Sequence, residues 1–195
     1  MIELSESTTE EPHLVPRTRR LRQSDEGRSA VLLGHVTGIL EEHGHTVDTL
    51  TLRDLPAEAL MHADFDDPAI VDAAARLEKA DGLIVATPVY KAAFSGLLKT
   101  WLDLLPQFGL DGKVVLPLAT GGSVAHALAL DYALRPVLTS MQARHVVNGF
   151  LVLDQFIESP TTGHLSAIHE DAEPALGKIV EGFLEGLQVV KVVAA

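Results

Sequence analysis

The sequence predicts an α/β fold, in which a parallel sheet is covered by helices on both faces. Three observations support this prediction. Short apolar runs typical of buried strands alternate with amphipathic segments typical of helices. The chain has 195 residues, which suits one domain with a full core. Hydrophobic residues make up 47% of it, as expected where both faces of a sheet are buried.

The first half of the chain contains two helices and one strand of this pattern. Apolar residues recur at helical spacing over residues 29–42, and Gly44 is placed to end that helix in a left-handed conformation. Residues 46–52 alternate like a strand. Asp67 and Pro68 form a cap and a first-turn proline for a helix that reaches about Ala80.

The second half repeats the alternation of strand and helix three times. The strands are expected at 83–87, 113–118 and 145–153, and the helices at 94–105, 123–142 and 172–190. Such alternation implies right-handed crossovers and a parallel sheet. The short units and the lack of a G-x-G-x-x-G fingerprint favour a flavodoxin-like three-layer sandwich, with a five-stranded parallel sheet in the order 2-1-3-4-5.

The first strand is the weak point of this fold. Leu14 and Val15 begin it, but residues 16–23 hold a proline and four arginines. Because burying unpaired guanidinium groups is prohibitive, we expect a defective first strand, truncated or replaced in part by residues 1–4. We therefore divide the chain into an irregular N-terminal segment, 1–23, and a flavodoxin-like domain, 24–195.

Composition excludes several classes of function. The net charge of −12 argues against nucleic-acid and anionic-membrane binding. The absence of cysteine excludes disulfides and a redox C-x-x-C, so redox chemistry would need a bound cofactor. The nine histidines are scattered without metal-site spacing, so we expect no metal. No apolar run is long enough to span a membrane and no signal peptide is recognisable, so we expect a cytoplasmic protein.

Two strand ends carry the residues best suited to a ligand. One strand runs into Thr87-Pro88-Val89-Tyr90-Lys91, which we expect to be a rigid loop. The next runs into Thr120-Gly121-Gly122-Ser123, followed by His126. Open α/β sheets bind ligands at such carboxyl ends. Nearly uncharged, glycine-containing loops suit a planar heterocycle held by backbone groups.

These residues resemble a known family. The words ADGLIVATP, ATPVYKAAFSGLLKTWLDLLP and GKVVLPLATGGSVAHALALDYALRPVL are similar to NAD(P)H-dependent FMN reductases that supply reduced flavin to alkanesulfonate monooxygenases. The resemblance covers roughly residues 44–154. It implies that the backbone of residues 88–91 and 120–123 lines the flavin ring: Pro88, Val89, Tyr90, Lys91, Thr120, Gly121, Gly122 and Ser123. In this family the neighbourhood of Lys91 also contacts subunit partners.

Four further residues have two interpretations each. Arg28 and Ser29 are either an ordinary helix start or, with the helix amides, a cradle for the FMN phosphate. His126 is either a flavin or nicotinamide contact or a capping residue. Tyr132 alone suggests core packing, but the resemblance implies a one-residue helix bulge at a tetramer interface. There it would affect whether flavin leaves or stays.

The resemblance implies an enzyme that passes a hydride from NADPH or NADH to FMN without an acid–base residue. It also implies a homo-oligomer, dimer or tetramer, and transient contact with an FMN-dependent sulfonate monooxygenase. An FMN-retaining quinone or azo-compound reductase is the alternative within the fold. A catalytically silent interaction protein is the alternative outside enzymes, because a reading-frame slip or damaged copy at residues 16–23 would weaken FMN binding.

Overall fold

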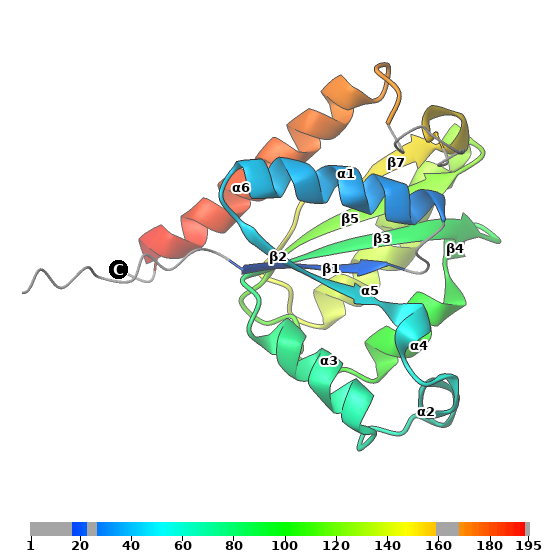
Figure 1. Ribbon diagram of the computed structural model, residues 1–195, viewed down its shortest axis with the longest axis vertical. Coiled ribbons are helices and arrows are strands. Elements are labelled where there is room, and N and C mark those ends of the chain that lie inside the picture. The colour runs from blue at the N-terminus through cyan, green and yellow to red at the C-terminus, as the bar shows by residue number, and fades with distance from the viewer. Residues whose placement is uncertain (1–16, 23–26, 159–167, 194–195) are drawn as a thin grey trace, which may run out of the picture.

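A computed structural model describes residues 17–22, 27–158 and 168–193, and it has the predicted three layers (Figure 1). The sheet is formed by β1 Arg17–Arg22, β2 Thr46–Thr51, β3 Gly82–Tyr90, β4 Ala93–Phe94, β5 Val114–Gly121, β6 His145–Val146 and β7 Phe150–Leu153. The α-helices are α1 Arg28–Glu42, α2 Ala57–His62, α3 Pro68–Glu78, α4 Gly96–Asp103, α5 Arg135–Ser140 and α6 Glu173–Val193.

The strands follow the order β2-β1-β3-β5-β6, and β7 pairs with β5 beyond the end of β6. All these pairings are parallel. With β6 and β7 counted together as the fifth main strand, this is the predicted 2-1-3-4-5 order. The short strand β4 turns back antiparallel on β3. The flavodoxin-like α/β class is therefore confirmed.

The arginine-rich segment is an interior strand of the sheet, between β2 and β3, which corrects our expectation. β1 pairs in parallel with β2 over Arg17 to Arg22 and with β3 from Thr18 to Leu21. Strand ladders are made by backbone N–H and C=O groups, so the pairing does not depend on apolar side chains. Part of the segment that we expected to be irregular thus belongs to the sheet. Residues 1–4, the expected substitute, lie outside the described residues.

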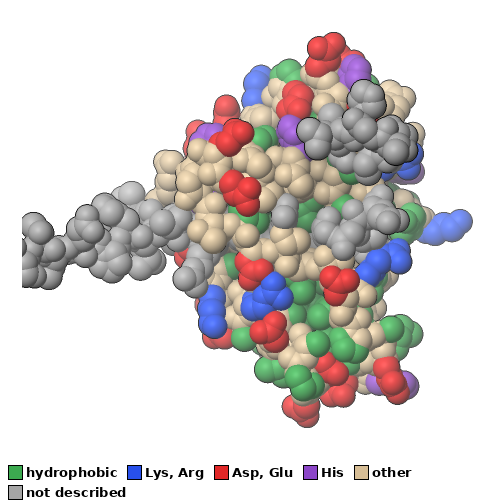
Figure 2. All heavy atoms as spheres, viewed as in Figure 1, with side chains coloured by type: hydrophobic (Ala, Val, Ile, Leu, Met, Phe, Trp, Pro, Cys, Tyr) green, Lys and Arg blue, Asp and Glu red, His purple; other side chains and the backbone are tan. Residues whose placement is uncertain are grey.

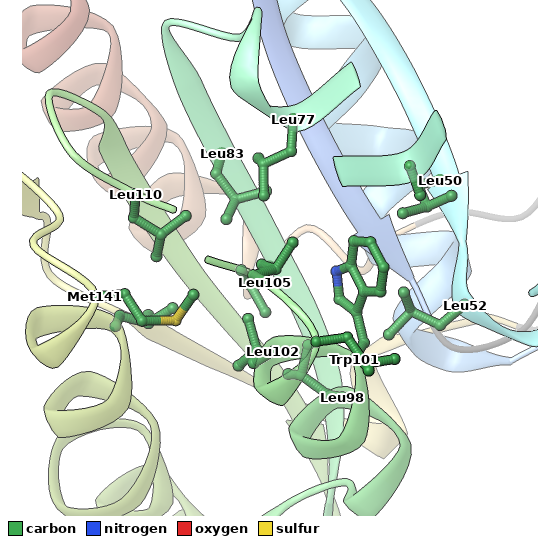
Figure 3. Close-up of a cluster of buried hydrophobic side chains, with 14 of the residues drawn as sticks. Leu50, Leu52, Leu77, Leu83, Leu98, Trp101, Leu102, Leu105, Leu110 and Met141 are labelled. Carbon is green, nitrogen blue, oxygen red and sulfur yellow. The ribbon is translucent and has the colours of Figure 1, made fainter. Parts of the chain in front are cut away.

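Helices cover the two faces of the sheet and create two cores. Figure 1 shows α1 and α6 on one face and α2, α3 and α4 on the other. On the second face, Trp101 is fully buried in a leucine-rich cluster drawn from α3, α4 and the strands (Figure 3). Leu98 and Leu102 flank it on α4 and are also buried, so this helix packs as its spacing predicts.

Two local predictions are confirmed at helix ends. The Asp67 carboxylate accepts hydrogen bonds from the backbone N–H groups of Ala69, at 2.8 Å, and Ile70, at 3.4 Å, and so caps α3. Gly44 follows α1 with φ of +80°, the left-handed conformation that glycine adopts without strain.

Two predicted elements are divided. The helix expected over 123–142 consists of a 3₁₀ turn η2 (Val124–Ala127), a π-helical turn η3 (Leu130–Leu134) and α5. The strand expected over 145–153 is broken into β6 and β7. Hydrophobic periodicity does not detect one-residue irregularities of this kind, because apolar residues continue through both segments.

The surface agrees with the acidic composition. Acidic side chains are scattered over the face in Figure 2 and do not gather in one patch. Within the described ranges, no helix combines the length and apolar character that crossing a membrane requires.

Candidate functional site

The carboxyl ends of β3 and β5 form the centre of the candidate site. The two strands pair in parallel up to Pro88 opposite Thr120, which brings the two predicted segments side by side. Gly121 continues β5 and pairs with Leu153 of β7. The ligand-binding edge predicted from the sequence is therefore assembled from adjacent strands.

The first of these segments is a hairpin rather than the predicted loop. β3 extends to Tyr90, and β4 pairs with it through Val89 opposite Phe94. Lys91 and Ala92 form the turn, with φ of +51° and +61°. A two-residue hairpin turn of the favoured type needs left-handed conformations at both central positions. The Lys91 side chain lies exposed at the tip of this hairpin.

Buried hydroxyl groups attach the hairpin to the helix that follows. The Thr87 hydroxyl accepts a hydrogen bond from the Ser95 N–H at 3.0 Å and donates one to the Pro88 carbonyl at 3.1 Å. The Ser95 hydroxyl accepts from the Leu98 N–H at 3.2 Å and caps α4. Because Thr87 and Ser95 are both buried, the hairpin has a fixed position relative to the sheet.

A cavity of about 230 Å³ lies at this edge of the sheet. It is lined by Gly27, Arg28, Ser29, Arg53, Pro88, Val89, Tyr90, Thr120, Gly121, Gly122 and Asp154. Eight of the predicted site residues thus share one cavity, although they come from three separate parts of the sequence. Lys91, Ser123 and His126 do not line it.

The cavity lining also includes charged residues. Arg28 begins α1, and its guanidinium lies 4.0 Å from the Asp154 carboxylate. Arg53 comes from the 3₁₀ turn η1 (Leu52–Asp54) that follows β2. Ser29 is buried beside Arg28 in the first turn of α1. Helix N-termini carry N–H groups without an intrahelical partner, so this end of α1 favours an anion.

His126 supports the wall of the cavity from behind. A Cβ atom added at Gly121 would lie 2.7 Å from the His126 Nδ1 atom, so the ring packs directly on this glycine. That Nδ1 atom is buried and has no hydrogen-bond partner among the described residues. The helix cap at this point is Ser123, whose hydroxyl accepts from the Ala125 N–H at 3.3 Å. The capping interpretation therefore belongs to Ser123 and not to His126.

Tyr132 lies in the π-helical turn η3, which has the bulge that the resemblance implies. The Arg135 N–H bonds to the Leu130 carbonyl, the five-residue spacing of a π-helix. The Tyr132 side chain is 79% exposed, so the core-packing interpretation is wrong. Val124 and Leu128 precede it at four-residue intervals and are exposed as well.

The model of the NADPH-dependent FMN reductase family matches residues 22–158, which is more than half of the chain. The chain belongs to this family. The match includes both strand ends and the charged residues of the cavity lining, and it begins at the last residue of β1.

Two relatives illustrate this membership. The chain is 53% identical over 127 residues to an "FMN reductase (NADPH)" of Pseudomonas putida, an alignment that covers 65% of this chain and 64% of the relative. It therefore spans less than two thirds of that relative's length. It is 32% identical over 161 residues to the "NADH-dependent FMN reductase SfnF" of Pseudomonas fluorescens, covering 79% and 85% of the two chains.

A solved structure is similar over most of the fold. The apo form of an NADH:FMN oxidoreductase, EmoB, aligns with a TM-score of 0.75 and 37% identity. The alignment covers 87% of this chain and 88% of that one. The similarity extends beyond the residues that carry the sequence motifs.

Sequence reasoning missed three cavity residues of this FMN reductase family member: Gly27, Arg53 and Asp154. Asp154 comes directly after β7, and Arg53 is the second residue after β2. The rule that identified the other two strand ends would have found them, had it been applied to every strand of the sheet.

Other parts of the described structure are less suited to a cofactor. A larger cavity of about 680 Å³ lies between α3 and residues 104–109, with mainly apolar side chains around it. Its polar residues, among them Glu78 and Lys113, lie near the amino ends of strands β3 and β5, away from the strand ends that bind ligands in such folds. The described residues contain no group of three or more His, Asp or Glu placed to hold a metal ion.

Proposed function

We propose that the protein is an NAD(P)H-dependent FMN reductase that supplies reduced flavin to a sulfonate monooxygenase. The observation that carries the proposal is the single cavity in which the ends of β3 and β5 meet the N-terminus of α1. The names of the relatives support the same reaction, with NADPH in one and NADH in another. Both nucleotides therefore belong in the test.

The chemistry of the cavity lining supports a phosphorylated flavin as its ligand. Gly121 and Gly122 present backbone without side chains, and a ring can approach such a wall closely. Arg28 and Arg53 provide two guanidinium groups for a phosphate. We assign the ring end to residues 88–90 and 120–122 and the phosphate end to Arg28, Ser29 and Arg53. Bound FMN supplies the hydride chemistry when a reduced nicotinamide stacks on it.

The protein's own contribution to this reaction is orientation. The paired strands hold the Thr120–Gly122 backbone in a fixed place, and the Thr87–Ser95 hydrogen bond holds the hairpin opposite it. No general acid or base is needed to pass a hydride between two bound rings. We place Lys91, Ser123 and His126 around the site, as supports or as contacts of the nicotinamide, because they do not line the cavity.

We further propose a cytoplasmic homo-oligomer, a dimer or tetramer, that meets its monooxygenase only transiently. Support comes from the exposed apolar side chains of Val124, Leu128 and Tyr132, which follow one another along the helical segment next to β5. Soluble monomers rarely leave such groups of apolar residues exposed. In this arrangement Tyr132 would pack near a neighbouring subunit and influence whether flavin stays bound.

The test is oxidation of NADPH and NADH by the purified protein, with and without added FMN. We expect colourless protein and nucleotide oxidation that depends on added FMN. Yellow protein that reduces quinones or azo compounds without added FMN would instead identify a flavin-retaining reductase. Absence of both colour and activity would indicate a silent interaction protein.

A further inference from the structure

Two one-residue irregularities of the fold lie against each other. One is the π-helical turn η3, in which the chain holds an extra residue compared with an α-helix. The other is the break between β6 and β7. Pairing with β5 advances three residues from Val115 to Leu118, but four residues from Val146 to Phe150 on the outer strand. The outer strand therefore has a bulge of one residue.

A proline explains where the bulge occurs. The bulged residues lie beside Pro117 of β5, which has no N–H to donate to a neighbouring strand. Gly149 fits there because it has no side chain. A Cβ atom at Gly149 would lie 3.1 Å from the Pro117 carbonyl oxygen and 3.1 Å from Cδ1 of Leu130. Leu130 is the first residue of the π turn, so the bulge and the turn are in direct contact.

Arg135 connects the same two irregularities by hydrogen bonds. Its Nη1 donates to the Val146 carbonyl at 2.6 Å and its Nη2 to the Val147 carbonyl at 3.0 Å, both at the bulge. Its Nε donates to the Asp131 carboxylate at 3.0 Å, inside the π turn. All three guanidinium nitrogens are thus used, and the planar group spans from the helix to the strand.

We propose that Arg135 is a positioning residue that holds the π turn, and with it Tyr132, against the bulged edge strand. π-helical turns are rare and need support from their surroundings. A shift to α-helical bonding would move a side chain by one residue, which is about 100° around the helix axis. Such a shift would turn Tyr132 away from its present direction. The bulge and the turn therefore act as one unit that sets the direction of Tyr132.

The first experiment measures hydrogen exchange of the backbone amides in residues 130–135. We expect exchange at least about tenfold faster in Arg135→Gln and in Arg135→Lys, because lysine cannot bond to the carboxylate and both carbonyls together. The control is Arg144→Gln, which loses a hydrogen bond from an exposed arginine to the Gly186 carbonyl at 2.9 Å. Unchanged exchange in Arg135→Gln, or full protection in Arg135→Lys, would overturn the proposal.

A second variant approaches the unit from the strand side. Gly149→Ala places a methyl group against Leu130 and Pro117, and we expect the same local increase in exchange. Gly177→Ala in α6 is its control, because a Cβ atom there would meet nothing within 4 Å. If the amides of residues 130–135 exchanged no faster in Gly149→Ala than in the native protein, the two irregularities would not be coupled. The same conclusion would follow if these amides exchanged faster in Gly177→Ala as well.

The functional consequence rests on the proposed function and is measured by FMN dissociation. Arg135→Gln should change the FMN dissociation constant in the same direction as Tyr132→Ala, and the double variant should resemble Tyr132→Ala alone. Additive effects would mean that Arg135 does not act through Tyr132. If the native protein bound no FMN, the proposed function would fail, while the exchange experiment would still decide whether the unit exists.

Discussion

The two ends of the candidate cavity are built on different principles. The ring end consists of neighbouring strands in one continuous ladder, with Pro88 opposite Thr120, and no side chain from this end carries a charge. The phosphate end collects Arg28 and Arg53 from elements that follow β1 and β2. Asp154, which follows β7, lies between the two groups: its carboxylate is 4.0 Å from Arg28 and 3.9 Å from where a Cβ atom of Gly122 would be. We therefore expect the ring end to recognise flavin by shape and the phosphate end to recognise it by charge. Changes of shape should have large effects on flavin affinity, whereas changes of charge should be moderate and sensitive to salt.

The largest effect should come from added volume at the ring end. In Gly121→Val, the Cβ atom alone would approach His126 Nδ1 to 2.7 Å. Overpacking costs about 1–3 kcal/mol, so we expect FMN affinity to fall roughly fivefold to 150-fold in a fluorescence titration. The control is Gly34→Ala in α1, where a Cβ atom has open space. Unchanged FMN affinity in the valine variant would remove this strand end from the site.

A double variant identifies the cause of that loss. If the added side chain acts by displacing the His126 ring, then Gly121→Ala combined with His126→Ala should recover most of the affinity lost in Gly121→Ala. If the side chain meets the flavin directly, the second substitution should restore nothing. Non-additivity of this kind is expected of residues in contact.

The next effect concerns the phosphate end. We expect Arg28→Met and Arg53→Met each to weaken FMN binding about tenfold and to leave riboflavin binding unchanged. Hydrogen bonds to charged groups contribute about 1.5–3 kcal/mol, and exposure places Arg28 at the lower limit of that range. Arg76→Met, which breaks an ion pair with Asp48 away from the cavity, serves as the control. If a variant lost equal affinity for FMN and for riboflavin, the substitution would have disturbed the structure of the site and not a contact with the phosphate.

A smaller effect of opposite sign should follow from Asp154→Asn. The Asp154 carboxylate faces the cavity and lies 4.0 Å from Arg28, so it competes with a phosphate for that cation. Surface ion pairs contribute about 0.2–1 kcal/mol, so FMN affinity should rise by up to about fivefold at low salt. Asp103→Asn, which removes an exposed partner of Lys99, is the matched control. Weaker FMN binding in the Asp154 variant would instead show that the carboxylate itself binds the cofactor.

The smallest effect concerns stability rather than binding. Burial lowers the pKa of Lys113 below its ordinary 10.5, although Asp81, Glu78 and Asp111 oppose this. Between the lowered pKa and 10.5 the unfolded chain binds more protons, so the free energy of unfolding should rise with pH. The Tm of the native protein should therefore increase relative to Lys113→Met as the pH is raised into this alkaline window. If the difference in Tm between the native protein and Lys113→Met did not change with pH, the lowered pKa of Lys113 would be contradicted.

The sequence allowed most of the ring end to be predicted, for a physical reason. Strands buried on both faces are continuous apolar runs, and their carboxyl ends are easily recognised. Pro88, Thr120 and Gly121, which the sequence predicts at the ends of two strands, line one cavity there, although the segment at 87–91 is a hairpin and not a loop. The hairpin was missed because its turn consists of Lys91 and Ala92, which lack the glycine or asparagine signals of such turns.

The phosphate end and the first strand were harder to predict. β1 is an interior strand despite its arginines, because its position depends on backbone pairing with β2 and β3. Arg53 and Asp154 lie more than 100 residues apart and come together only through the sheet order. The π turn at Tyr132 was expected from family resemblance alone. Its supports, Arg135 and the bulge at Gly149, have no signature in the sequence.

Titration of the native protein with FMN and with riboflavin tests the two-ended site most directly. If strand ends hold the ring and Arg28 and Arg53 hold a phosphate, FMN should bind at least about tenfold more tightly than riboflavin at low salt. The difference in affinity between FMN and riboflavin should become smaller as salt is added. Equal affinities would contradict the phosphate end. No binding of either flavin would mean that the arginine-rich strand β1 fails to place Gly27, Arg28 and Ser29 at the end of the sheet.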